Sequence, residues 1–264
     1  MVQDQHIAVR GLRYAYESEG PVLTALAAVD LEVGRGEFLS VIGPSGGGKT
    51  TLLKVIGGLL EPTSGTVAIG GLAPGEARRR KEIGYVFQDP ALLPWRTVVQ
   101  NIALPLEVNR GEARSGEMEP ERLLDVVGLR EFRDYHPHRL SGGMRQRVAL
   151  ARSLVTDPSV LLMDEPLGSL DEITRAAMRY ELLRVWEVSR KTVVMITHSI
   201  AEAVMMSDRV AVLSHRPGRV VGEVAIDLPR PRDESLEHSR AYREHTNRVK
   251  EVLSFGSGRG ASLG

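Results

Sequence analysis

Short runs of apolar residues recur along the chain, each bounded by polar or glycine-containing segments, and predict strands. They lie at residues 7–9, 38–42, 66–69, 83–87, 160–163, 192–197 and 210–213. The runs VLLM at 160–163 and TVVMIT at 192–197 show no alternation of apolar and polar positions. Strands of a parallel sheet that helices cover on both faces have this pattern. We therefore expect a mostly parallel sheet.

Helical stretches lie between these runs, at residues 49–60, 144–155 and 174–189. In the last stretch, Ala177, Tyr180 and Leu183 are expected to form one buried stripe, with charged residues opposite. Strands that alternate with helices predict an α/β fold.

Two regions depart from this alternation. Residues 90–155 contain helix formers and few β-branched runs, which predicts an inserted helical subdomain, with an exposed polar loop at 109–120. After Pro217 the chain has one short strand and proline-rich connections, and a charged helix is expected at 240–253. We expect residues 256–264 to form a disordered tail.

Composition narrows the function classes. The chain has 264 residues, of which 42% are hydrophobic and 26% are charged, as in ordinary globular proteins. Its 34 Lys and Arg balance 34 Asp and Glu, which argues against a general nucleic-acid binder. The lack of cysteine excludes disulfides, thiolate metal sites and a cysteine nucleophile. No segment has the roughly 20 apolar residues of a spanning helix, and no signal peptide is evident.

The residues GPSGGGKT at 43–50 match the phosphate-loop pattern G-x-x-x-x-G-K-[ST] between a predicted strand and a helix. Such glycines let backbone N–H groups surround phosphate oxygens, and the helix N-terminus adds favourable partial charge. Lys49 is expected to reach the β- and γ-phosphates and Thr50 to bind Mg²⁺. A glycine-rich turn is the alternative, which the flanking elements disfavour. The expected ATP contacts are Gly43, Pro44, Ser45, Gly46, Gly47, Gly48, Lys49, Thr50 and Thr51.

An apolar strand at 160–163 ends in two carboxylates, Asp164 and Glu165. Ligands bind at the carboxyl ends of parallel strands. We expect Asp164 to hold Mg²⁺ and Glu165 to polarise the water that attacks the γ-phosphate. Many ATPases and kinases share these two elements, so they do not define the family, and a surface Asp-Glu pair is the alternative.

The sequence LSGGM at 140–144 precedes a helix and resembles the LSGGQ signature of ATP-binding-cassette (ABC) ATPases. In that family the signature of one subunit closes on the ATP that the other subunit holds. The resemblance therefore implies that Ser141, Gly142 and Gly143 bind phosphate in a homodimer. An N-capped helix with flexible glycines is the alternative. Met144 departs from the usual glutamine.

Other positions match landmarks of the same family. Gln88 resembles the glutamine that contacts Mg²⁺ and the lytic water and senses the membrane partner. Residues 168–171 resemble the D-loop. His198 resembles the switch histidine that contacts the γ-phosphate, although Ser199 stands where many members have aspartate. Tyr16 resembles the aromatic residue that stacks on adenine, with Tyr14 as the other candidate.

The resemblance covers residues 5–230, with a charged helical region at 231–255. It implies a P-loop NTPase core with a mostly parallel sheet, an antiparallel β subdomain and the inserted helical subdomain. The expected catalytic residues are Glu165, His198, Gln88 and Lys49. The expected Mg²⁺ ligands are Thr50, Gln88 and Asp164.

The segment LLPWRTVVQN at 92–101 resembles the nitrate/sulfonate/taurine importer subfamily, as do residues 215–220 and 227–232. This resemblance implies an ATPase subunit on the cytoplasmic face of the membrane. Its partners would be a separate permease and an extracytoplasmic solute-binding protein. The apolar cluster Leu92, Leu93, Pro94 and Trp95 is expected to help receive the permease. Packing inside the helical subdomain is the alternative.

Other functions stay open at this stage. An ABC exporter or lipid transporter would use the same ATPase chemistry. A soluble ABC ATPase that acts on nucleic acid is disfavoured by the zero net charge and by the single cassette. A P-loop kinase is disfavoured by the LSGGM segment and the position of His198.

Overall fold

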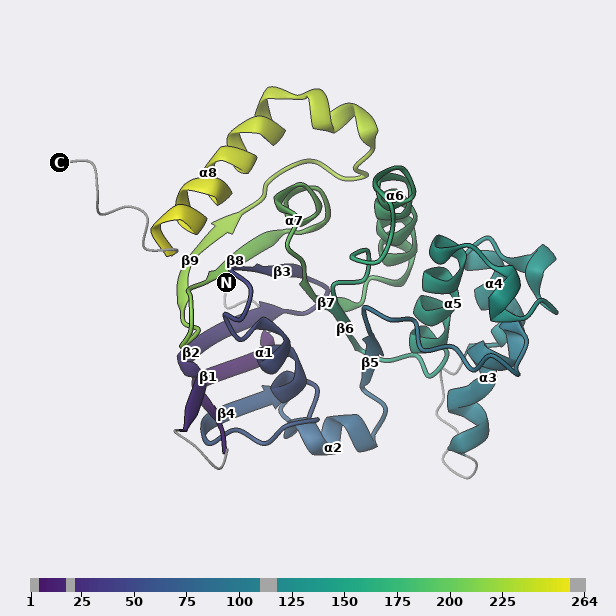
Figure 1. Ribbon diagram of the computed structural model, residues 1–264, viewed down its shortest axis with the longest axis horizontal. Helices are drawn as coiled ribbons and strands as arrows, with labels where there is room; N and C mark the ends of the chain where they lie inside the picture. Colours follow the sequence, from purple (N-terminus) through teal and green to yellow (C-terminus); the bar gives the residue numbers. More distant parts are fainter. Residues whose placement is uncertain (1–4, 18–21, 110–117, 257–264) are drawn as a thin grey trace. The chain divides into compact units, whose positions relative to one another are not determined.

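The computed structural model describes residues 5–17, 22–109 and 118–256 (Figure 1). The chain forms two compact units, one from residues 1–80 with 192–264 and the other from residues 81–191. Most of the expected polar loop at 109–120 and all but the first residue of the expected tail lie outside the described residues.

The first unit contains an antiparallel sheet with strand order β2-β1-β4. Its strands are β1 (Gln5–Tyr16), β2 (Leu23–Gly34) and β4 (Ser64–Ile69). Val29, Leu31 and Val33 of β2 are buried, whereas Asp30 and Glu32 between them are more exposed. This alternation matches the two faces of a strand and confirms the antiparallel subdomain.

The same unit contains a mostly parallel sheet. Its strands are β3 (Phe38–Ile42), β7 (Thr192–Ile196), β8 (Arg209–Leu213) and β9 (Val220–Ala225). Strand β3 pairs in parallel with β7 and β8, and β9 joins β8 antiparallel. Every residue of β3 and β7 is buried, as their continuous apolar sequences predict. The helices of this unit are α1 (Lys49–Ile56), α2 (Pro74–Arg79), α7 (Ile200–Met206) and α8 (Arg240–Gly256).

The second unit contains a parallel strand pair and the expected helical insertion (Figure 1). The strands are β5 (Ile83–Val86) and β6 (Val160–Asp164). The helices are α3 (Val98–Val108), α4 (Pro120–Val126), α5 (Gly142–Leu154) and α6 (Glu172–Ser189), with short 3₁₀ turns at Arg130–Phe132 and Pro137–Arg139. Helices α3 and α4 pack on α5, so the insertion has its own core.

Two expectations were wrong in detail. Ala177 of α6 is exposed, and the buried face instead contains Met178, Leu182, Leu183, Val185 and Trp186. Helix α8 continues through Gly256, where a disordered tail was expected to begin. A Cβ at Gly256 would lie 2.7 Å from Val221 Cγ2, so this glycine allows close packing of the helix on β9.

Asn101 organises the loop between β5 and α3. Its side chain is fully buried, and its amide nitrogen donates to the carbonyl oxygens of Leu93, Arg96 and Thr97 at 2.9–3.2 Å. Its carbonyl oxygen accepts the Leu93 N–H at 2.8 Å. The loop is therefore held by one amide side chain.

We predict that Asn101→Ala lowers the free energy of unfolding by about 1–3 kcal/mol, because it leaves buried backbone groups without partners. Urea unfolding monitored by circular dichroism measures this change. The control is Val108→Ala, at the exposed end of α3, which should change stability much less. Equal losses in the two variants would contradict the central role of Asn101.

Candidate functional site

The phosphate loop connects β3 to α1 in the first unit, and close backbone contacts define its shape. Gly48 has φ 87°, and a Cβ there would lie 2.7 Å from the carbonyl oxygen of Ala25. A Cβ at Gly47 would lie 2.7 Å from the carbonyl oxygen of Ser214. The loop thus runs between β2 and the segment after β8, at distances that exclude larger residues.

Lys49 lies under this loop with only 5% of its surface exposed. Its Nζ donates to the carbonyl oxygens of Gly43 at 2.8 Å and Pro44 at 2.9 Å. These bonds hold the ammonium group at the loop, where a phosphate-binding lysine is needed. The neighbouring Thr50 is exposed at the start of α1.

An aromatic side chain lies beside the same helix. The hydroxyl of Tyr16 is 2.9 Å from Oγ1 of the buried Thr51, and Tyr16 is 38% exposed. Tyr14 contacts the ring of Tyr16 edge-on, with centroids 4.9 Å apart. Thr51 thus places Tyr16, rather than Tyr14, directly against the helix that follows the phosphate loop.

His198 follows β7 on the same sheet edge as the phosphate loop. Strands β3 and β7 are parallel, with Val41 paired to Ile196, so Gly43 and His198 each follow two residues later. His198 is exposed. Ser199 caps α7, because its hydroxyl accepts the Glu202 N–H at 3.2 Å. The serine that departs from the family pattern therefore makes the cap that an aspartate can also make.

In the second unit, Gln88 and the Asp164–Glu165 pair also share a sheet edge. Val86 of β5 pairs with Met163 of β6, so Gln88 and Glu165 each follow two residues later. A Cβ at Gly168 would lie 3.2 Å from Gln88 Nε2 and 3.4 Å from Glu165 Oε2. The amide and the carboxylate therefore converge on this glycine, and a side chain there would crowd both.

Glu165 has an unusual backbone conformation, with φ 47°. A residue other than glycine in this region carries backbone strain on the order of 1–3 kcal/mol, and such residues cluster at functional sites. The turn is closed by the Gly168 N–H, which donates to the Glu165 carbonyl oxygen at 3.0 Å. The strained backbone conformation is therefore found at Glu165, the residue that is expected to polarise the attacking water.

Tyr85 of β5 lies close enough to Asp164 to be affected by its charge, and motif reasoning did not find this tyrosine. Burial raises the pKa of its phenol, and the negative charge of Asp164 raises the pKa further. The phenol therefore stays protonated at neutral pH, and it lies in the electric field of Asp164. A tyrosine in a β-rich run gives no motif signal, because packing explains it equally well.

The signature segment begins α5. The hydroxyl of Ser141 accepts the Met144 N–H at 3.2 Å, which caps the helix. A Cβ at Gly143 would lie 3.0 Å from Thr174 Cγ2, so this glycine lets α5 approach α6. The capping alternative is thus present in the structure, and the cap uses one of the N–H groups at this helix end.

A cavity of about 550 Å³ lies beside the signature. The residues that line it are Gln88, Asp89, Pro90, Gly142, Arg145 and Ser169. The second unit therefore brings the expected glutamine, signature and D-loop to one cavity.

Arg152 of α5 holds the chain just after Gln88. Its guanidinium donates to the carbonyl oxygens of Pro90 at 2.5 Å and Ala91 at 2.9 Å. Burial lowers the pKa of this arginine, which nevertheless keeps its charge. Sequence reasoning missed Arg152, because the sequence around an arginine on a helix does not indicate which distant carbonyl groups its guanidinium binds.

The donor set suits Mg²⁺. Thr50, Gln88 and Asp164 offer a hydroxyl, an amide oxygen and a carboxylate, and hard cations prefer such oxygen ligands. No group of three or more His, Cys, Asp or Glu that could hold a metal occurs within the part of the chain that the structure describes. Mg²⁺ usually binds through one or two carboxylates together with substrate phosphates.

The residues expected to act on ATP belong to both units. The first unit holds the phosphate loop, Tyr16 and His198, and the second holds Gln88, Asp164, Glu165 and the signature. A protein-family model described as ABC transporter matches residues 26–168, which include parts of both units. The chain belongs to the ABC transporter family. It is an ATPase of that family, and ATP is its substrate.

Related proteins extend over nearly the whole chain. An uncharacterized ABC transporter ATP-binding protein of Methanocaldococcus jannaschii is 46% identical over 94% of this chain and 91% of its own. The taurine import ATP-binding protein TauB of Roseobacter denitrificans is 40% identical over 94% of this chain and 93% of its own. A solved ATP-binding cassette, a dimer in a post-hydrolysis state with ADP and Pi, has TM-score 0.72 and 34% identity, over 84% of this chain and 100% of its own.

We predict that Tyr16→Ala raises the Kd for ATP roughly tenfold, because a base–aromatic stack contributes about 1–3 kcal/mol. Binding of a fluorescent ATP analogue measures the change. Tyr14→Ala is the matched control and should change Kd less. If Tyr14→Ala weakens binding more than Tyr16→Ala, the assignment of Tyr16 to adenine is wrong.

Proposed function

We propose that this ABC ATPase powers the import of a small solute of the taurine or sulfonate class through a separate permease. The observation that carries the proposal is the likeness to a taurine import ATP-binding protein over more than nine-tenths of both chains. The segment around Trp95 supports the same class, because it resembles that importer subfamily.

Each of the expected site residues has its own role in ATP binding or hydrolysis. Backbone N–H groups of the phosphate loop and the ammonium group of Lys49 bind the phosphates. Thr50, Gln88 and Asp164 would hold Mg²⁺, which would neutralise phosphate charge. Glu165 accepts a hydrogen bond from the attacking water and orients it. His198 donates to the γ-phosphate and stabilises charge in the transition state.

The working unit is a homodimer. Ser141, Gly142 and Gly143 of each copy contact the ATP that the other copy binds. Because only ATP offers the γ-phosphate, ATP favours the closed dimer and hydrolysis favours opening. The dimeric cassette with ADP and Pi supports this arrangement, since it is 34% identical to this chain.

We predict that Glu165→Gln lowers kcat for ATP hydrolysis at least ~100-fold, because the amide cannot accept a proton from water. ATP binding should persist, and the variant should form a stable dimer with ATP. Phosphate release and size-exclusion chromatography measure the two effects.

Glu131→Gln, an exposed change in the same unit, is the control and should turn over normally. Normal turnover by Glu165→Gln would refute its role as the catalytic carboxylate. A slow variant that stays monomeric with ATP would instead count against the dimer.

The permease is proposed to bind at Trp95. This side chain is 71% exposed, and the neighbouring Pro94 is exposed as well. Asn101 and Arg152 fix the surrounding backbone. An exposed indole on a rigid loop matches an interface anchor, because little ordering entropy is lost when it is covered.

The location proposed for the chain is peripheral, at the cytoplasmic face of a membrane. None of the described helices is long and apolar enough to cross a bilayer. An extracytoplasmic solute-binding protein would deliver the solute to the permease.

We predict that Trp95→Ala weakens co-purification with a polytopic membrane protein from detergent-solubilised membranes, because it removes the anchor. It should leave the ATPase rate of the isolated chain unchanged. Uptake of labelled taurine by cells should fall more than that rate does.

Val108→Ala is the control, since Val108 is 73% exposed on the same helical insertion. It should retain the membrane partner. Equal losses of uptake and isolated ATPase activity in Trp95→Ala would contradict the docking role.

A further inference from the structure

Helix α7 is short, and its two ends are held by side chains from different segments. Its N-terminus follows His198, and Ser199 caps it. Its last carbonyl groups accept hydrogen bonds from the segment 226–232, which follows β9. Helix ends leave four carbonyl groups without partners inside the helix, so a seven-residue helix depends on what binds them.

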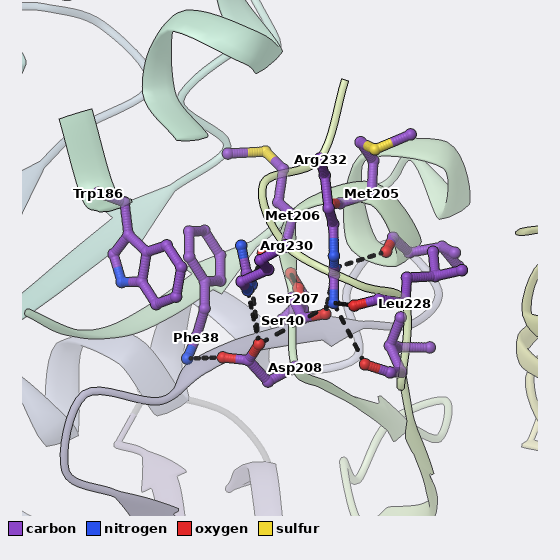
Figure 2. Close-up of polar contacts among 12 residues, drawn as sticks. Phe38, Ser40, Trp186, Met205, Met206, Ser207, Asp208, Leu228, Arg230 and Arg232 are labelled. Atoms are coloured by element: carbon purple, nitrogen blue, oxygen red, sulfur yellow. Dashed lines mark hydrogen bonds and ion pairs between the residues drawn. The ribbon is translucent and has the colours of Figure 1, made fainter. Parts of the chain in front are cut away.

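Arg232 binds most of these carbonyl groups. Its side chain is only 1% exposed, and Nη1 donates to the carbonyl oxygens of Val204 at 3.2 Å, Met205 at 3.0 Å and Ser207 at 2.8 Å. Nη2 donates to two carbonyl oxygens of its own segment, those of Ile226 and Leu228, at 3.2 and 3.1 Å. The guanidinium thus joins this segment to the end of α7 (Figure 2).

Arg230 binds the one remaining carbonyl group at this end of α7. Its Nη2 donates to the Met206 carbonyl oxygen at 2.8 Å and to Asp208 Oδ1 at 2.8 Å. The other carboxylate oxygen of Asp208 accepts the Phe38 N–H at 2.9 Å, at the start of β3 (Figure 2). The two arginines therefore bind four consecutive carbonyl groups, 204–207, and connect them to the strand that leads into the phosphate loop.

The positive charge of Arg232 suits its position at the C-terminus of α7. The C-terminus of a helix carries negative partial charge, and a cation there is stabilising. Burying a guanidinium is costly unless its donors are bonded, and here backbone carbonyls accept five of its hydrogen bonds. An apolar side chain could fill the same volume, but it would not fix the carbonyl positions.

We propose that Arg232, supported by Arg230, is a positioning residue for His198. The pair fixes α7 at its C-terminal end, and the rigid helix transmits that position to the histidine at the other end. The inference rests on the proposed contact of His198 with the γ-phosphate. It assigns the segment after β9 an influence on hydrolysis, although this segment lies outside the phosphate loop, signature and carboxylate motifs.

The test compares Arg232→Ala, Arg232→Lys and Leu228→Ala, each also combined with His198→Ala. Leu228 is buried in the same segment, so Leu228→Ala removes packing but no side-chain bond to α7. The measurements are kcat, the Kd for ATP and the free energy of unfolding. Arg232→Lys serves if Arg232→Ala does not fold, because it keeps the charge with fewer and differently placed donors.

We expect the Arg232 variants to lower kcat roughly tenfold with unchanged Kd, since small misplacements of catalytic groups are costly. Leu228→Ala should lower stability and leave kcat near normal. In the His198→Ala background the Arg232 changes should lower kcat no further, because both act through one group.

Two results would overturn the inference. Equal kcat losses with and without His198 would show that Arg232 does not act through the histidine. A fall of kcat in Leu228→Ala equal to that in Arg232→Lys would assign the effect to stability. If His198→Ala alone turns over normally, the proposed role of His198 fails first, which separates that failure from the failure of the arginine proposal.

Discussion

The constraint on which the first unit depends is the close approach of other backbone segments to the phosphate loop. The carbonyl oxygens of Ala25 and Ser214 come so near to Gly48 and Gly47 that any Cβ would collide with them. Hydrogen bonds of Gly218 with Ala25 and Ala27 hold the two flanking segments together. The antiparallel subdomain and the region after β8 therefore fix the backbone conformation of the phosphate loop. Glycine is required at these two positions because a larger residue does not fit.

The second unit relies on a different principle, in which side chains hold backbone. Asn101 and Arg152 bind carbonyl groups on both sides of the loop that carries Trp95. Gln88 and Glu165 converge at Gly168. Side-chain hydrogen bonds thus hold the loop that carries Trp95, and Gly168 leaves room for the glutamine and the carboxylate to approach each other.

Sequence reasoning predicted the elements that have strong local signals. The continuous apolar runs of β3, β6 and β7 and the phosphate-loop motif needed no tertiary information. Strand β2 was missed, because its signal is alternation, as at Val29, Leu31 and Val33, and the runs sought were continuous. Helix α7 was missed because seven residues give too little periodicity. The role of Arg230 and Arg232 gave no local signal, since their carbonyl partners on α7 lie more than twenty residues earlier.

The discontinuity of the first unit has a consequence for synthesis. Strand β3 carries the phosphate loop, yet both strands that pair with it come after residue 191. The second unit, residues 81–191, is continuous and leaves the ribosome before those strands do. Long-range pairing must wait for its partner strand, whereas local contacts form early. The nucleotide loop is therefore completed late, after the unit that bears the signature has had time to fold.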